Sequence, residues 1–194
     1  MITLAMDTSH VFLVLALIKD DQLVDSVQKK CWKRQSEEIF PCLMDMMDRN
    51  GLKPDDIDAM VITEGPGSYT GVRIAMTIAK VFCVMKEKPL YTIGTLQLFA
   101  GKRNGRVILD ARGGRVYTAV IENGAYAEKP HIIMKDEVKA DEVCAGDRQL
   151  IGLSEDYGDL AQNFVDLKDQ WVKADNVNLV KPEYLKPSTA YLVK

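Results

Sequence analysis

The first half of the chain alternates short apolar runs with polar turns and then changes to longer stretches with helical spacing. Short apolar runs between turn residues are typical of buried strands, whereas apolar residues three and four apart indicate a helix. The pattern predicts three antiparallel strands, a helix, a strand, a second helix, a strand and a short third helix. The predicted strands are 2–6, 11–18, 23–27, 59–63 and 90–93, and the predicted helices are 36–50, 70–85 and 95–101.

A polar break at residues 102–105 separates this half from the rest and predicts two subdomains, 1–103 and 104–194. The second half begins like the first, because one strand ends in Asp7-Thr8-Ser9 and another in Asp110-Ala111-Arg112. This order of strands and helices favours an α/β fold with mixed sheets and helices on their faces. The predicted elements of the second half are strands 106–109, 116–121 and 150–153 and a helix over 156–165, with a loop-like tail from Lys181.

The helix predicted over 70–85 is apolar around most of its circumference. Gly71, Ala75 and Ala79 form a ridge of small residues along which another helix could approach closely. Such a helix is either fully internal or part of a subunit interface, together with the methionine-rich face of helix 36–50. The interface interpretation predicts a partner or dimer contact made of Phe40, Leu43, Met44, Met47, Gly71, Ile74, Ala75, Ile78 and Ala79.

A glycine-rich turn, TEGPGSYTGVRIA, joins strand 59–63 to this helix. It has neither the lysine of a Walker phosphate loop nor the glycine spacing of a dinucleotide site. Gly65, Pro66 and Gly67 make a sharp bend, and Ser68 or Thr70 can cap the helix. The free N–H groups at the helix start could hold an anion, although a tight corner without a ligand fits equally well.

Composition narrows the classes of function. The chain has 194 residues, of which 47% are hydrophobic and 27% charged, with a net charge of -3. These are values of an ordinary soluble domain, and a chain that bound RNA or DNA tightly by itself would be basic. The four scattered cysteines are typical of reduced, buried thiols, and polar residues interrupt the apolar start of the chain. We therefore expect a cytoplasmic protein without a membrane segment.

Catalytic signatures are sparse. The only histidines are His10 and His131, no H-x-x-x-H, C-x-x-C or G-x-S-x-G motif is present, and we expect no metal site. A Cys–His pair is neither excluded nor favoured. Asp7 and Asp110, each at the end of a predicted strand, could hold a metal-bound phosphate or could cap turns.

Four segments resemble the TsaB family, also called YeaZ: MITLAMDTS, RQSEEIFPCL, GLKPDDIDAMVITEGPGSYTGVRIAMTIAK and ILDARGGRVYTAV. The stretch GPGSYTGVR is the most specific of these. The resemblance covers residues 1–121, and KPEYLKPS near the end is also similar. It implies an actin-like, sugar-kinase-like (ASKHA) fold of two related halves, each a mixed β-sheet flanked by helices.

The resemblance also implies a role in making threonylcarbamoyladenosine at adenosine 37 of tRNAs that read codons beginning with A. In that family a partner, TsaD, carries out the transfer, and the TsaB protein is a non-catalytic companion that binds and activates it. A small ATPase, TsaE, joins them, the isolated chain forms a homodimer, and tRNA is reached only through the complex. The two helices named above would form the interface.

No cofactor is expected to bind firmly, but the resemblance leaves room for ATP or ADP at the junction with TsaD, near Asp7, Thr8, Asp110 and Arg112. Two features depart from the family. Gln35 stands where a histidine is common, which weakens the case for a metal, and the second half is short. The alternatives are an ATP-dependent transferase of the same fold acting alone, and a peptidase, for which no metal pair or nucleophile elbow is present.

Overall fold

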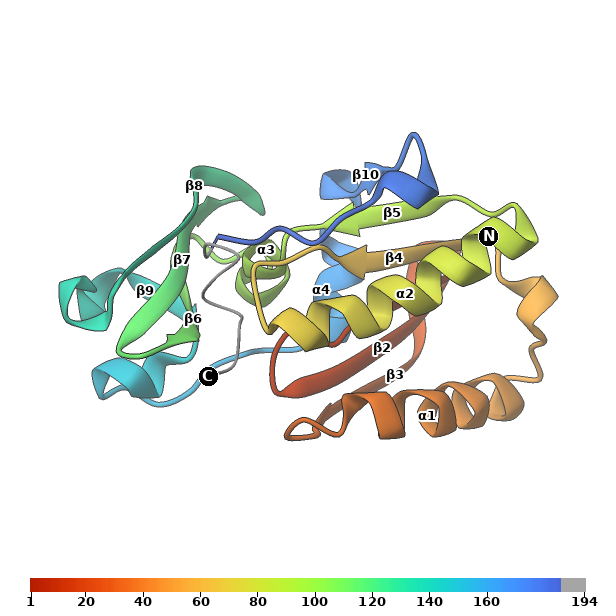
Figure 1. Ribbon diagram of the computed structural model, residues 1–194, viewed down its shortest axis with the longest axis horizontal. Coiled ribbons are helices and arrows are strands. Elements are labelled where there is room, and N and C mark those ends of the chain that lie inside the picture. The colour runs from red at the N-terminus through yellow and green to blue at the C-terminus, as the bar shows by residue number, and fades with distance from the viewer. Residues whose placement is uncertain (186–194) are drawn as a thin grey trace.

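The first half of the chain, together with a short strand near its C-terminal end, builds a lobe around a six-stranded mixed sheet (Figure 1). The computed structural model describes residues 1–185. The strand order is β10-β5-β4-β1-β2-β3, in which β4 pairs in parallel with β1 and β5 and the remaining pairs are antiparallel. The strands are β1 Ile2–Asp7, β2 Phe12–Lys19, β3 Gln22–Lys30, β4 Ala59–Thr63, β5 Leu90–Ile93 and β10 Val172–Lys173.

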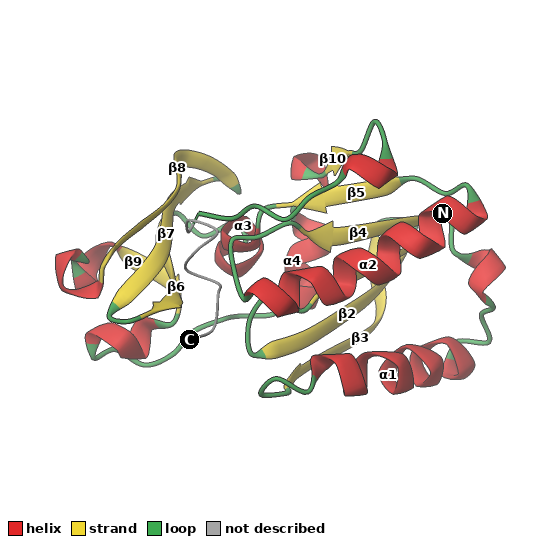
Figure 2. Ribbon diagram, in the orientation of Figure 1, coloured by secondary structure: helices red, strands yellow, loops and turns green. Residues whose placement is uncertain are grey.

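Helices cover both faces of this sheet (Figure 2). Helices α1 (Gln35–Arg49) and α2 (Tyr69–Lys86) lie side by side on one face, where Ile39, Met46 and Met76 pack into one hydrophobic core. On the other face α3 (Thr95–Ala100) and α4 (Leu160–Asp166) fill a second core, which continues to the second sheet. Short 3-10 helices occur at Pro54–Asp56, Lys135–Glu137, Ala140–Glu142, Arg148–Ile151, Lys168–Gln170 and Val177–Leu179.

The second lobe is a smaller mixed sheet with the order β8-β7-β6-β9. Numbered within its own half, this order is third, second, first, fourth, which repeats the order β3-β2-β1-β4 of the first sheet. Both sheets also pair their first and fourth strands in parallel. The repeat confirms the predicted α/β fold of two related halves. The strands are β6 Gly105–Arg112, β7 Arg115–Glu122, β8 Ala125–Met134 and β9 Val143–Gly146.

The second half departs from the sequence-based expectations in two ways. Residues 150–153, predicted as a strand, belong to a turn and a 3-10 helix, and the fourth strand lies earlier, at β9. Strand β8 was not predicted, because it is a half-exposed edge strand that contains Pro130 and lacks regular alternation. Moreover, α4 and β10 pack on the first sheet, so the residues after 104 do not all belong to the second lobe.

The start of the first helix also differs. Helix α1 begins at Gln35 rather than Ser36, and Arg34 precedes it without a side-chain cap. Gln35 is buried instead, and its side-chain amide donates to the carbonyl of His10 at 2.7 Å. Of the family-like segment KPEYLKPS, residues 181–185 follow the loop-like course expected, whereas 186–188 lie outside the described residues.

Candidate functional site

The glycine turn after β4 is filled by the chain's own backbone. A Cβ atom on Gly67 would lie 2.5 Å from the carbonyl oxygen of Ser9, and one on Gly65 would lie 2.7 Å from that of Glu183. Gly65 also has a φ of +113°, which side chains rarely adopt. The Oγ of Ser68 accepts a hydrogen bond from the N–H of Gly71 at 3.2 Å. Ser68 therefore caps α2 as predicted, and the turn positions α2 against its own lobe.

The small-residue ridge of α2 faces the sheet, and its assignment to an interface was wrong. Gly71, Ala75 and Ala79 are all buried. The hydroxyl of Thr8 donates to the carbonyl of Gly71 at 2.6 Å and accepts from the N–H of Ala75 at 3.1 Å. A Cβ on Gly71 would lie 2.2 Å from the carbonyl oxygen of Thr8. Small side chains are needed here because α2 lies directly on β4 and on the turn that follows β1.

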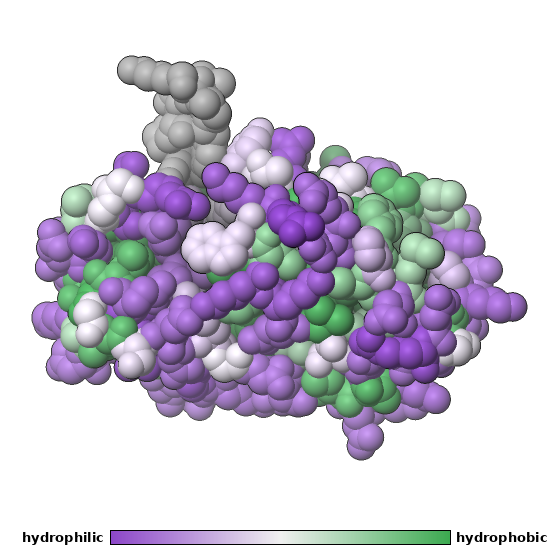
Figure 3. Space-filling view, turned by 90° about the horizontal axis from the view of Figure 1, so that it is seen from below, coloured by the Kyte–Doolittle hydropathy of each residue, from purple (hydrophilic) through white to green (hydrophobic). Residues whose placement is uncertain are grey.

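The opposite sides of α1 and α2 expose large apolar side chains. On α1, Phe40 is 56% and Met44 is 65% exposed; on α2, Val81 is 54% and Met85 is 74% exposed, and Val84 is exposed as well. We call these five residues the apolar helical face. In the view from below, with α1 toward the viewer, apolar side chains lie among the polar ones in the right half of the molecule (Figure 3). The other predicted interface residues, Leu43, Met47, Ile74 and Ile78, are half-buried and pack against the core beside this face.

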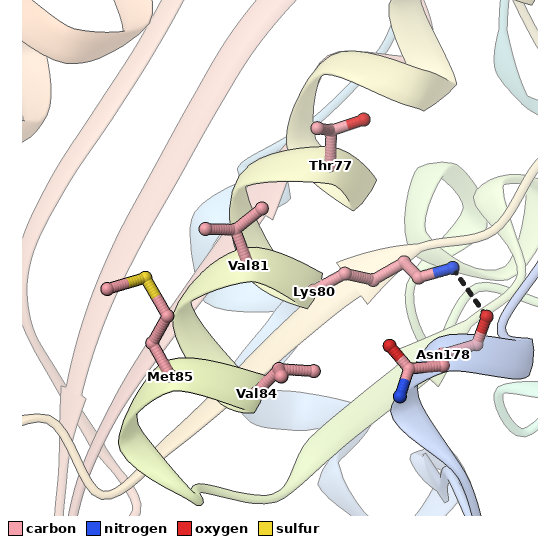
Figure 4. Close-up of a pocket in the computed structure, with 6 residues that line it drawn as sticks. All are labelled: Thr77, Lys80, Val81, Val84, Met85 and Asn178. Carbon is pink, nitrogen blue, oxygen red and sulfur yellow. Dashed lines mark hydrogen bonds between the residues drawn. The ribbon is translucent and has the colours of Figure 1, made fainter.

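A shallow hollow of about 390 Å³ runs along the outer side of α2 (Figure 4). Thr77, Val81 and Met85 line it from successive turns, and Asn178 closes the other side. The ammonium of Lys80 donates to the carbonyl of Asn178 at 3.0 Å, which holds the C-terminal segment against the helix. Val81, Val84 and Met85 were not among the predicted interface residues. They nevertheless follow Arg73 and Thr77 at intervals of three and four residues on one side of the helix.

A buried polar cluster joins the two lobes. The Nε2 of His10, which follows β1, donates to the Oδ2 of Asp147, which follows β9, at 2.9 Å. Asp147 also accepts from the backbone N–H of Asp110 at 2.6 Å and from the hydroxyl of Tyr157 at 2.5 Å. Burial by itself would raise the pKa of Asp147, but the hydrogen bonds and charge of His10, Tyr157 and Asp110 outweigh it and lower the pKa to about 2.

Aromatic rings enclose the same cluster. The ring of His10 stacks on that of Phe12 with centroids 5.9 Å apart, and it meets the edge of Phe99 at 5.2 Å. The ring of Tyr157 lies 4.9 Å from that of Phe12. The Nδ1 of His10 is buried and has no partner among residues 1–185. Side chains thus fill the space that separates the lobes.

The four residues predicted to lie near a nucleotide have hydrogen-bond partners within the chain. Asp7 is fully buried and accepts from the N–H of Ser9 at 3.0 Å and from the hydroxyl of Thr63, and burial raises its pKa. Thr8 binds α2, as described above. Asp110 accepts from the N–H of Arg112 at 2.7 Å, within the exposed hairpin between β6 and β7. The approach of a nucleotide to these four residues stays a prediction.

Two further properties concern the described residues as a whole. Side chains of His, Cys, Asp and Glu form no cluster of three or more that could hold a metal ion within residues 1–185. Over the same residues, none of the helices has the length and apolar character needed to cross a membrane.

Comparison with known proteins agrees with this architecture. Residues 27–155 match the family model of TsaD: tRNA N6-adenosine threonylcarbamoyltransferase. The tRNA threonylcarbamoyladenosine biosynthesis protein TsaB of Bacillus subtilis is 33% identical over 129 residues, which cover 63% of this chain and 56% of that protein. The TsaB protein of Escherichia coli is 34% identical over 146 residues, 70% of this chain and 63% of that protein. The matches thus span only about three fifths of these curated relatives.

Among solved structures, YeaZ from Pseudomonas aeruginosa aligns with a TM-score of 0.74 and 20% identity, covering 95% of this chain and 99% of that chain. Two related lobes with a repeated strand order, each a mixed sheet with helices, define a two-lobed α/β protein. The family model matches more than half of the chain, and the curated relatives named above are TsaB proteins. The chain belongs to the TsaD family and, within it, to the TsaB (YeaZ) group.

Proposed function

We propose that this chain is a non-catalytic subunit of the complex that installs threonylcarbamoyl on adenosine 37 of tRNAs reading codons that begin with A. In this proposal it binds and activates TsaD, which supplies the chemistry, and TsaE joins the two. The chain contacts tRNA only through the complex and forms a homodimer when its partners are absent. The names of the TsaB relatives support the pathway.

The apolar helical face is the observation that carries the proposal of a binding role. Exposed large apolar side chains gathered on two neighbouring helices are typical of surfaces that associate with other proteins. Phe40, Met44 and Met85 expose more than half of their surface to solvent. Burying aromatic and methionine side chains of this size supplies much of the free energy of a protein interface.

The buried cleft supports a non-catalytic role more than the alternative of an ATP-dependent transferase. That alternative would place Asp7 and Asp110 around a metal-bound phosphate. The carboxylate of Asp7 is fully buried, its Oδ1 accepts from Ser9 and Thr63, and the backbone N–H of Asp110 donates to Asp147. We therefore propose that any ATP or ADP binds at the junction with TsaD, not between the lobes of this chain.

Reconstitution of the reaction tests the proposed function. Threonylcarbamoyl transfer to tRNA would be measured with TsaD and TsaE from the same source, with and without this chain. We expect transfer only when the chain is added, and no ATP hydrolysis by the chain alone. ATP turnover by the isolated chain that disappears in Asp7→Ala would instead favour the transferase. Full transfer without the chain would contradict the proposal.

A further inference from the structure

The N-terminal end of α2 carries a cationic cluster that the apolar helical face does not include. The guanidinium of Arg73 lies over the ring of Tyr69, 5.3 Å from its centroid, and its Nη1 donates to the Tyr69 hydroxyl at 2.9 Å. The ring of Tyr184 stacks on Tyr69 with centroids 5.1 Å apart and an interplanar angle of 25°. The pKa of Arg73 is raised, mainly by hydrogen bonding to Tyr184 and to a smaller extent by the proximity of Tyr69.

The C-terminal segment holds Tyr184 in this position. The N–H of Glu183 donates to the carbonyl of Glu64 at 2.6 Å, directly beside the glycine turn. Further back, the ammonium of Lys80 binds the carbonyls of Asn178 and Val180 at 3.0 and 2.9 Å. Two sites of attachment therefore fix the segment along α2. Three aromatic and cationic side chains, from segments far apart in the sequence, are brought to one place on the surface.

The guanidinium of Arg73 has no carboxylate to bind in the described part of the chain. Every other arginine of residues 1–185 except Arg115 lies within 4 Å of a carboxylate oxygen. Helix α2 also has no acidic residue in its first turn, so the partial positive charge of the helix terminus adds to that of Arg73. The ring of Tyr69, itself stacked on Tyr184, limits the rotamers of Arg73, which lowers the entropy lost when it binds a planar anion.

This cluster is continuous with the apolar side of α2. A hollow of about 280 Å³ is lined by Tyr69, Thr70, Arg73, Ile74 and Thr77. Thr77 also lines the neighbouring hollow that contains Val81, Val84 and Met85. An apolar hollow and a cationic hollow therefore adjoin at Thr77 on the same side of the helix. With a rise of about 1.5 Å per residue, Arg73 and Val81 lie about 12 Å apart along the helix.

We propose that Arg73, positioned by Tyr69 and by Tyr184 of the C-terminal segment, binds a carboxylate of the partner protein whose apolar helix packs on Val81 and Met85. The acidic residue would lie about two helical turns from the residue that contacts Val81. This inference rests on the proposed binding of TsaD. It adds a charged end to the interface, which would fix the direction in which the partner helix lies.

Isothermal titration with TsaD from the same source, without RNA, tests the assignment. We expect Arg73→Gln to weaken binding about tenfold and Arg73→Glu about 100-fold, because a charge-assisted pair is lost and then replaced by repulsion. Tyr184→Ala should weaken binding about threefold to tenfold, because Arg73 loses a positioning contact. Raising NaCl from about 0.05 M to about 0.5 M should weaken the wild-type complex more than that of Arg73→Gln.

Two control variants separate this inference from the function it rests on. Arg115 on the second lobe is the other arginine that lacks a carboxylate partner within residues 1–185. Arg115→Glu reverses the charge there and should bind TsaD as the wild type does. Val81→Asp places a charge in the apolar hollow and should abolish binding. If Val81→Asp loses binding to TsaD while Arg73→Glu binds as wild type, the carboxylate contact alone is overturned. A loss of tRNA binding in Arg73→Glu would not change that conclusion. Wild-type binding by both variants would overturn the proposed interface as well.

Discussion

The buried contact between the lobes leads to a prediction about Asp147→Asn. The carboxylate of Asp147 receives hydrogen bonds from His10, Tyr157 and Asp110, and its side chain is 4% exposed. Its pKa is lowered from 3.8 to about 2. A shift of this size contributes roughly 2 kcal/mol of stability at neutral pH. An asparagine also points an NH₂ donor at groups that are themselves donors, so we expect a total loss of about 3 kcal/mol.

Urea unfolding at several pH values provides the assay. A carboxyl group whose pKa is lower in the folded state stabilises above the pKa of the unfolded chain and loses that contribution as pH falls through the folded value. The difference between wild type and Asp147→Asn should therefore be largest above about pH 4 and shrink toward pH 2. At neutral pH the melting temperature should fall by about 6 to 12 °C.

A nearby exposed carboxylate supplies the matched control. Glu155 pairs with Lys30 at 2.6 Å, but its side chain is 49% exposed. Exposed ion pairs contribute little, so Glu155→Gln should change the free energy of unfolding by less than about 0.5 kcal/mol. A loss of unfolding free energy in Asp147→Asn no larger than that in Glu155→Gln would contradict the stabilising role of the Asp147 carboxylate. The same role would be contradicted if the loss in Asp147→Asn stayed constant from pH 7 to about pH 2.

Other variants test the two sides of α2. Ala75→Trp should unfold the chain, because the side chain at this position is 1% exposed, whereas Val81→Trp should leave circular dichroism and melting unchanged. Gly71→Ala should lower the free energy of unfolding, measured by urea denaturation, by about 2 to 3 kcal/mol, because the new Cβ would meet the carbonyl of Thr8. A folded Ala75→Trp or a fully stable Gly71→Ala would contradict the position of α2 on the sheet. Burial raises the pKa of the Cys83 thiol to about 11. Alkylation at about pH 8, followed by mass spectrometry, should therefore modify Cys83 only after unfolding. Rapid alkylation in the folded state would contradict the burial of Cys83.

The first lobe could be predicted from the sequence because its signals are local. Strands β1, β2, β4 and β5 are short apolar runs bounded by turn residues, β3 follows β2 across a polar turn, and α2 has both a serine cap and continuous helical spacing. The second lobe gave weaker signals. Strand β8 lies at an exposed edge, and its pairing with β7 depends on contacts that leave no regular pattern in the sequence.

The candidate site was predicted in part. Phe40 and Met44 were identified because they lie on the methionine-rich side of α1, and both are exposed. The ridge of Gly71 and Ala75 was assigned to the wrong side, since small residues allow close approach to a sheet as readily as to another helix. The contact of His10 with Asp147 joins residues 137 positions apart, so only the folded chain reveals it.

Size-exclusion chromatography with light scattering, on this chain mixed with TsaD from the same source, tests the central claim most directly. We expect a stable mixed complex with the wild-type chain, and separate elution when Phe40 and Val81 are both changed to aspartate in a chain that remains folded. A wild-type chain that elutes apart from TsaD, or a double variant that still forms the complex, would contradict the assignment of the apolar helical face as the binding surface.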